Sequence, residues 1–172
     1  MDKEKKKQII SGAYKGSKIC EFGITHYRYH DCKAEDLVLT NDDILVHKSC
    51  LKAFNKMQDA AKKEGLTINI ISGFRSAKYQ IEVFSRKFKD TSNVTDDEFA
   101  ARLKYSAPSG FSEHHTGLAI DINSLEEDFE ETKEFDWLVH NASKFGFEMS
   151  FPRNNSQGVG YEPWHWRFIG KI

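Results

Sequence analysis

Long hydrophobic runs are missing from this sequence. No stretch approaches the roughly 18 consecutive apolar residues that a membrane-spanning helix requires, and the first residues lack the apolar core of a signal peptide. We therefore expect no membrane-spanning segment in this chain. This absence does not fix the compartment, because it does not exclude a longer precursor from which an export signal or anchor is removed.

A charge excess is also missing. The chain has 25 Lys and Arg against 26 Asp and Glu, a formal net charge of -1, which gives no electrostatic case for binding nucleic acid. The one basic run, Lys3 to Lys7, contains no interleaved aromatic residues. We interpret it as a solvated chain end and expect no nucleic-acid partner.

Cysteine is scarce and unfavourably spaced for a metal knuckle. The three cysteines are Cys20, Cys32 and Cys50, and none forms a C-x-x-C pair. One disulfide with one free thiol, or three reduced thiols, are both compatible with this pattern.

The remaining composition predicts one folded domain. With 172 residues, of which 39% are hydrophobic, the chain can bury one substantial core. Residues 1–33 are polar without a sustained period, so we expect an irregular N-terminal arm before a domain at 34–172. Periodicity and turn residues predict helices at 48–64, 77–89, from 95 to before Pro108, and 131–145, with strands at 66–71, 118–122, 147–151 and 164–169.

Two segments together have the chemistry of a metal site. One is the stretch Ser112 to Asp121, with sequence SEHHTGLAID, and the other is Glu162 to His165. Imidazole and carboxylate are ligands that catalytic zinc accepts, with a fourth position left for water. His114, Asp121 and His165 would supply the three ligands. Glu162 precedes His165 by three residues, so a tight turn would bring its carboxylate beside that water.

Each of these residues also has an ordinary structural explanation. Asp121 stands in an apolar strand and would be costly to bury alone, but an arginine partner would serve as well as a metal. His165 could belong to an aromatic cluster with Trp164 and Trp166, although strand alternation directs it away from both tryptophans. A metal site explains both residues at once.

The spaced motif Ser-x-His-x-x-Gly-x-Ala-x-Asp followed by Glu-x-x-His resembles the signature of the VanY-type D-Ala-D-Ala carboxypeptidases and the related VanX-type dipeptidases and L,D-carboxypeptidases. Residues 72–76, with sequence SGFRS, and Gln80 look like the substrate-binding segment of that family. Residues 162–168, with sequence EPWHWRF, look like its closing strand. The resemblance covers roughly residues 36–170.

This resemblance implies a role for each site residue. His114, Asp121 and His165 would ligate Zn²⁺, and Glu162 would be the catalytic base. Arg75 resembles the arginine that stabilises developing negative charge or grips the peptide carboxylate, tasks that suit a planar guanidinium. The groups that hold the peptide terminus would be Ser112 and Gln80, for which loop hydrogen bonding and an exposed helix position are the respective alternatives.

His115 stands where the family more often has glutamine. It is a rival to His114 as a ligand, because the two residues are adjacent. Neighbouring residues on an extended segment face opposite ways, so only one of them would reach the metal. The spacing from Ser112 favours His114.

The resemblance implies an α+β fold in which a small, mainly antiparallel sheet carries the ligands and helices flank it, as in hedgehog and D,D-peptidase domains. We expect a zinc carboxypeptidase that removes terminal D-Ala from peptidoglycan stem peptides. L,D-carboxypeptidase, D,D-dipeptidase and endopeptidase activities are alternatives, and a hedgehog-like zinc-binding recognition module is the non-enzymatic one. The substrate suggests a location in the cell envelope, the periplasm or outside the cell, or in the cytoplasm if precursors are cleaved. We expect a monomer, the default for a small peptidase with no evident apolar stripe left over.

Overall fold

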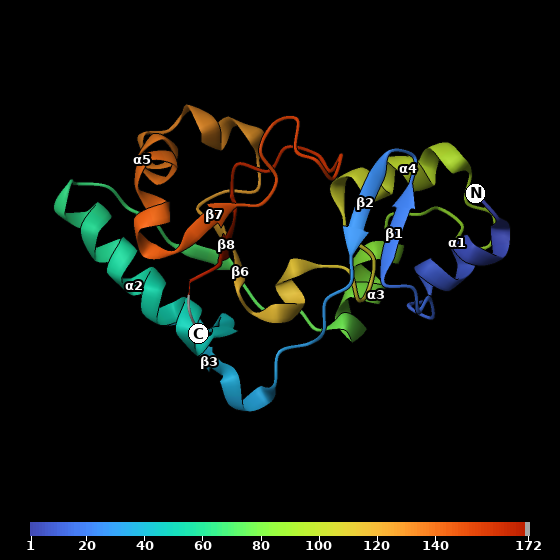
Figure 1. The fold of residues 1–172 in the computed structure, drawn as a ribbon, viewed down its shortest axis with the longest axis horizontal. Helices are drawn as coiled ribbons and strands as arrows, with labels where there is room; N and C mark the ends of the chain where they lie inside the picture. The colour runs from blue at the N-terminus through green and yellow to red at the C-terminus, as the bar shows by residue number, and fades with distance from the viewer. Residues whose placement is uncertain (171–172) are drawn as a thin grey trace.

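Two lobes lie side by side in the structure, a computed structural model that describes residues 1–170 (Figure 1). The sheet lobe contains β3 (Leu37–Leu39), β4 (Leu45–His47), α2 (Lys48–Lys63), β5 (Ile70–Ser72), β6 (Ala119–Ile122), α5 (Lys133–Asn141), β7 (Phe147–Met149) and β8 (His165–Phe168). The helical lobe contains α1 (Lys3–Ile10), β1 (Lys18–Glu21), β2 (Ile24–Tyr27), α3 (Ala77–Ser85) and α4 (Asp96–Tyr105). Residues 171 and 172, which end the predicted domain, lie outside the described residues.

A four-stranded antiparallel sheet is the centre of the sheet lobe. Its strand order is β5-β6-β8-β7, so the two strands that carry predicted ligands, β6 and β8, are neighbours in its middle. β3 and β4 form a separate two-stranded antiparallel ribbon. Helices and small antiparallel sheets confirm the predicted α+β class.

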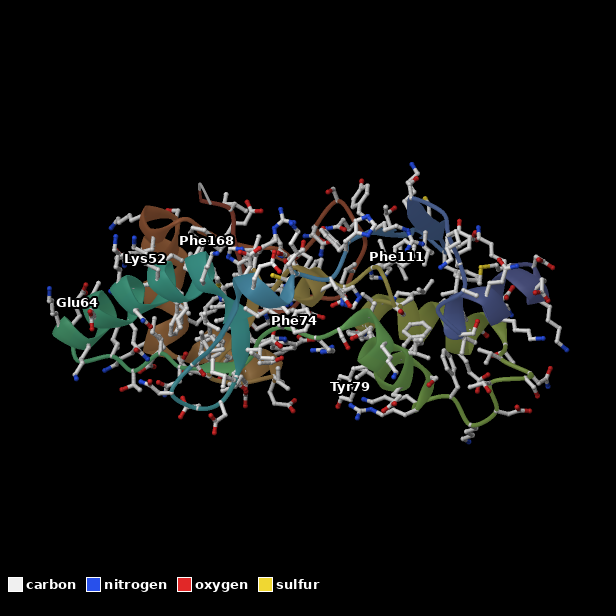
Figure 2. The ribbon with its side chains drawn as sticks, turned by 90° about the horizontal axis from the view of Figure 1, so that it is seen from below. Lys52, Glu64, Phe74, Tyr79, Phe111 and Phe168 are labelled. Carbon is white, nitrogen blue, oxygen red and sulfur yellow. The ribbon has the colours of Figure 1, made fainter. Side chains whose placement is uncertain are left out.

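Each lobe has its own apolar core. In the sheet lobe, α2 buries Phe54 and Met57 against sheet residues that include Ile120 and Phe168. In the helical lobe, Phe111 belongs to a second buried cluster. Figure 2 shows Phe168 and Phe111 in the two different lobes, with Phe74 between them. The packing of both cores therefore fixes the position of the segment around Phe74, which joins the two lobes.

Residues 1–33 are not irregular, and this expectation was wrong. They contain α1 and the β1–β2 hairpin, whose buried residues Ile9, Ile10, Ile19 and Ile24 join the core of the helical lobe. Asp2 caps α1 by accepting a hydrogen bond from the backbone N–H of Lys5. The segment forms part of the folded structure.

The other predicted elements occur with shorter bounds. The helix expected at 77–89 ends at Ser85, and the strand expected at 66–71 is reduced to β5. β5 starts late because the backbone N–H of Asn69 donates to the side chain of Asn123 rather than to a strand. The helix expected at 131–145 is α5 followed by a 3₁₀ turn, Ala142–Phe145.

Within residues 1–170, no helix combines the length and apolar character that crossing a membrane requires. All three cysteines lie in this range and are free thiols, which removes the disulfide alternative. Burial raises the pKa of the Cys50 thiol to about 12.

Candidate active site

The sheet register places two predicted ligands directly opposite each other. Asp121 on β6 pairs with His165 on β8 and, on its other side, with Ser72 on β5. Directly opposed residues of antiparallel strands project from the same face, so both side chains point to one side of the sheet. Trp166 alternates to the other face and is buried in the core, as the sequence predicted.

His114 reaches the same place from a tight turn. It lies in a 3₁₀ turn, Glu113–Thr116, which Gly117 ends with a φ of 67°. The ring Nδ1 of His114 lies 2.7 Å from the carbonyl oxygen of Gly73. Since a carbonyl oxygen only accepts, Nδ1 carries the proton and donates it. The other nitrogen, Nε2, faces Asp121 at 3.3 Å.

The three side chains form a cluster that suits a cation. Each of the three residues His114, Asp121 and His165 offers one ligand atom, and these atoms lie within 4.8 Å of one another. All three residues are buried. His114 Nε2 and the Asp121 carboxylate face each other at 3.3 Å, an arrangement that requires a cation or a proton between the two atoms. Two nitrogens and one oxygen are also a donor set that zinc accepts.

His165 is held between carboxylates on both sides of its ring. Nδ1 lies 3.1 Å from Asp121 and 3.7 Å from Glu162, while Nε2 lies 3.1 Å from Glu113. Although burial opposes the charged ring, hydrogen bonds to Asp121 and Glu113 raise the pKa of His165 to about 10. Without a metal, a proton therefore occupies the space between Nδ1 and Asp121.

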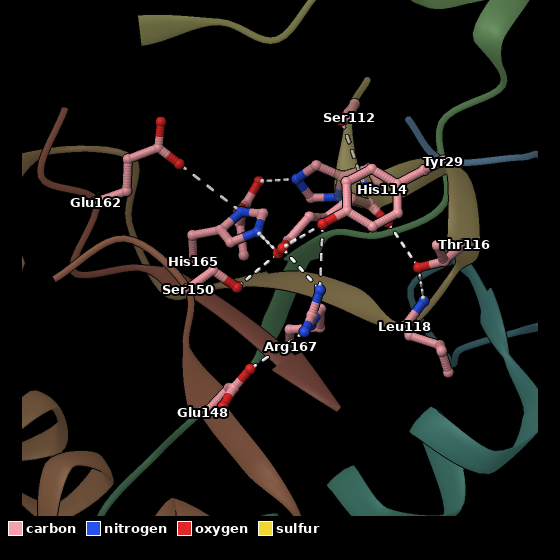
Figure 3. Close-up of polar contacts among 12 residues, drawn as sticks. Tyr29, Ser112, His114, Thr116, Leu118, Glu148, Ser150, Glu162, His165 and Arg167 are labelled. Atoms are coloured by element: carbon pink, nitrogen blue, oxygen red, sulfur yellow. Dashed lines mark hydrogen bonds and ion pairs between the residues drawn. The ribbon is translucent and has the colours of Figure 1, made fainter. Parts of the chain in front are cut away.

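Glu162 reaches the cluster through a turn. The backbone N–H of His165 donates to the carbonyl oxygen of Glu162 at 3.1 Å, which folds residues 162–165 tightly. This is the tight turn that the sequence required. Burial, together with the charges of Asp121 and Glu113, raises the pKa of Glu162 to about 7. Figure 3 shows its carboxylate beside His165.

Arg75 and Gln80 are linked to each other across the junction between the lobes. The Arg75 guanidinium donates to Gln80 Oε1 at 3.0 Å, and Gln80 Nε2 donates to the carbonyl oxygen of Ala107 at 2.6 Å. Gln80 is buried, so the alternative of an exposed helix position was wrong. Ser112 caps the 3₁₀ turn by accepting from the backbone N–H of His114, which is loop hydrogen bonding as the alternative required.

His115 does not take part in the cluster. Its Nδ1 donates to the carbonyl oxygen of Arg75 at 2.6 Å, and its Nε2 accepts from the backbone N–H of Gly110 at 3.0 Å. Both ring nitrogens are therefore occupied by backbone groups. The two adjacent histidines do diverge, but through a 3₁₀ turn and not through the extended segment that the sequence suggested.

A cleft of about 320 Å³ opens over the cluster. It is lined by residues of both lobes, namely His26, Ser72, Arg75, Gln80, Lys87, Tyr105, Ser106, Ala107, Phe111, Ser112, Glu113, His114, Asp121, Leu125, Phe151, Val159, Glu162, Trp164 and His165. All seven predicted site residues are in this set. Trp164 lines the cleft and also packs on the core of the sheet lobe.

The family of the chain follows from comparison with known proteins. A family model described as VanY, D-alanyl-D-alanine carboxypeptidase, matches residues 43–171. The chain belongs to the VanY family. This range contains the ligand cluster, Glu162, Arg75 and Gln80.

Two curated proteins are similar to this chain in sequence. YodJ of Bacillus subtilis, whose name assigns it to the carboxypeptidases, is 38% identical over 134 residues, covering 73% of this chain and 47% of its own length. A D-alanyl-D-alanine carboxypeptidase of Enterococcus faecium is 31% identical, covering 86% and 45%. The chain therefore spans about half the length of these curated relatives.

Solved structures give the same result. VanY from the VanB-type resistance cassette, in complex with Zn(II), has a TM-score of 0.67 at 28% identity, covering 82% of this chain and 80% of its own. The L,D-carboxypeptidase LdcB has a TM-score of 0.70 at 32% identity, covering 83% and 71%.

Two residues at the site were missed from the sequence. Glu113 is buried beside His165, and His26 lines the cleft from β2 with its Nε2 donating to the carbonyl oxygen of Leu103 at 2.8 Å. Arg167 was the signal for Glu113, because it lies two residues after His165 and so shares its face of β8. No comparable signal marks His26, because the polar composition of residues 1–33 predicts an irregular arm.

Proposed function

We propose that this protein is a zinc-dependent carboxypeptidase that removes the terminal D-alanine from peptidoglycan stem peptides. The observation that carries this proposal is the buried His114, Asp121 and His165 cluster, with the Glu162 carboxylate 3.7 Å from His165 in an open cleft. Zn²⁺ is present in a VanY structure with the same fold, and D-alanyl-D-alanine is bound in another.

His114 Nε2, an Asp121 oxygen and His165 Nδ1 would hold the metal. When bound, zinc lowers the pKa of a ligated water and polarises the scissile carbonyl. Glu162 is placed to take a proton from that water and to return it to the leaving amine. Its pKa near 7 in the metal-free site suits proton transfer in both directions near neutral pH.

The peptide end is assigned to the junction of the two lobes. Arg75 would pair with the terminal carboxylate or with the oxygen that becomes negative, because a guanidinium offers two parallel donors. Gln80 would act by fixing Arg75, as its carboxamide oxygen already accepts from that guanidinium. Ser112 retains a hydroxyl hydrogen for the substrate, since the contact it makes in the turn uses its oxygen as acceptor.

An L,D-carboxypeptidase is the second candidate, and one observation favours it. The identity to LdcB, 32%, exceeds the 28% to VanY from the VanB-type cassette, and both cover similar shares of this chain. The D,D-dipeptidase VanXYg, at 27% identity and a TM-score of 0.66, is less similar to this chain than LdcB. In every case the substrate places the protein with peptidoglycan or its precursors.

The structure of the site argues against a non-catalytic zinc module. A structural zinc site closes its coordination with a fourth protein ligand. His115 is the fourth-ligand candidate from the sequence, and both of its nitrogens are engaged by backbone groups. Glu162, in contrast, would serve as the base, and its carboxylate 3.7 Å from His165 supports this role.

The test is to incubate the protein with defined pentapeptide and tetrapeptide stems and to identify the released product. We expect D-alanine from the pentapeptide, loss of release with a chelator, and recovery on adding zinc. Release from the tetrapeptide alone would favour the L,D-carboxypeptidase. No release from any stem by zinc-loaded, folded protein would overturn the proposal.

A further inference from the structure

A buried carboxylate that belongs neither to the ligand cluster nor to the peptide clamp lies behind His165. The side chain of Glu113 is about 5% exposed and accepts four hydrogen bonds. Ser150 Oγ and His165 Nε2 donate to Oε2 at 2.5 and 3.1 Å, and Arg167 and Tyr29 donate to Oε1 at 2.9 and 3.1 Å. Figure 3 shows these donors converging behind the His165 ring.

Every group around Glu113 is a donor, so the carboxylate is fixed in position and in charge. Arg167 compensates the negative charge and is itself held by Glu148 at 3.3 Å across the β7–β8 pair. Tyr29 comes from the chain that follows β2, and Ser150 follows β7. Three segments that are distant in sequence therefore fix one carboxylate.

This fixed carboxylate selects the tautomer of His165. A carboxylate facing Nε2 holds a proton there, so a metal that displaces the proton between Nδ1 and Asp121 would meet a lone pair on Nδ1. His114 has the reverse arrangement, because Gly73 keeps the proton on Nδ1 and leaves Nε2 free. His165 thus presents Nδ1, and His114 presents Nε2, to the same candidate metal position.

We propose that Glu113, with Arg167 and Tyr29 behind it, is a positioning residue that prepares His165 to bind the metal through Nδ1. This inference rests on the proposed function, since it concerns the same metal. Carboxylates that accept from a ligating histidine orient the ring and raise its basicity, and losing one typically weakens metal binding about 10- to 100-fold.

The first test compares zinc dissociation constants of the wild type, Glu113→Gln and Glu148→Gln, measured by competition with a chelator. Glu148→Gln is the matched control, because it removes the same charge and another partner of Arg167 but does not contact His165. We expect Glu113→Gln to bind zinc about 10- to 100-fold more weakly, and Glu148→Gln to stay within about 2-fold of the wild type. Equal affinity of Glu113→Gln and the wild type would overturn the inference.

The second test needs no variant and so remains informative if Glu113→Gln does not fold. Nitrogen NMR of the ¹⁵N-histidine-labelled, zinc-loaded wild type should show zinc on Nδ1 of His165 with a protonated Nε2, and on Nε2 of His114. Coordination of His165 through Nε2 would overturn the inference. A wild type that binds no zinc at all would instead contradict the proposed function.

Discussion

The sheet lobe and the helical lobe contribute to the cleft in different ways. In the sheet lobe, strand pairing places Asp121 opposite His165, and the turn before β8 adds Glu162. From the helical lobe come groups that reach the cleft from helices or from the hairpin, such as Gln80 and His26. Strand register fixes two of the three candidate metal ligands, whereas the clamp depends on side chains that support one another. We therefore expect chemistry to depend on the sheet lobe and substrate affinity on the junction.

The largest expected effect is on turnover, from the sheet lobe. Glu162→Gln should lower kcat about 100- to 10,000-fold, because a positioned general base contributes that much, while zinc binding is retained. Steady-state kinetics and a zinc assay on the same preparation check both expectations. Unchanged turnover would show that Glu162 is not the catalytic base.

The same substitution should change stability when no metal is bound. Folding raises the pKa of Glu162 from 4.5 to about 7, so its ionisation destabilises the folded state progressively as the pH rises through that interval. By this shift, Glu162→Gln should stabilise the metal-free protein by up to roughly 3 kcal/mol at pH 8.5 and by little at pH 4.5. Thermal unfolding in chelator at both pH values measures the difference, and an equal gain at both would contradict it.

At the junction, Arg75→Lys should lower kcat/KM about 10- to 100-fold and leave the zinc dissociation constant unchanged. Lysine keeps the charge but loses the planar pair of donors. Arg86→Lys, an exposed substitution at the end of α3, is the control and should have no effect. A rise in KM alone would assign Arg75 to the peptide carboxylate, and a weakened zinc site would break the division between the lobes.

The smallest effect is expected at Gln80. Gln80→Leu keeps much of the buried volume but removes the acceptor of Arg75 and the donor to Ala107, so kcat/KM should fall about 5-fold, the value of roughly one hydrogen bond. The Arg75→Lys, Gln80→Leu double variant should then lose less than the two single losses combined. Fully independent losses would show that Gln80 does not act through Arg75.

The candidate ligand cluster could be predicted because its residue types, motif spacing and strand alternation are all local properties of the sequence. A buried aspartate in an apolar strand and a histidine between two tryptophans are each unusual. One metal site explains both Asp121 and His165. Gln80 was placed in the site by resemblance, but its burial could not be predicted, because that depends on the carbonyl of Ala107 from another segment.

The N-terminal hairpin could not be predicted from the sequence, and the reason is physical. β1 and β2 have four residues each and are joined by Phe22 and Gly23, both with positive φ, at 55° and 74°. Such two-residue turns are usually marked by Asn-Gly or Asp-Gly, and a phenylalanine at the first position conceals the signal. For Glu113 the sequence offers only Arg167 as a signal, because its contacts with Tyr29 and Arg167 join positions that are distant in sequence.

The central claim is that His114, Asp121 and His165 hold one zinc ion beside Glu162. Anomalous diffraction at the zinc edge from crystals of the zinc-loaded protein tests it directly. We predict a single strong peak about 2.0–2.2 Å from His114 Nε2, from an Asp121 oxygen and from His165 Nδ1. The absence of a peak there, or coordination through His115, would contradict the account.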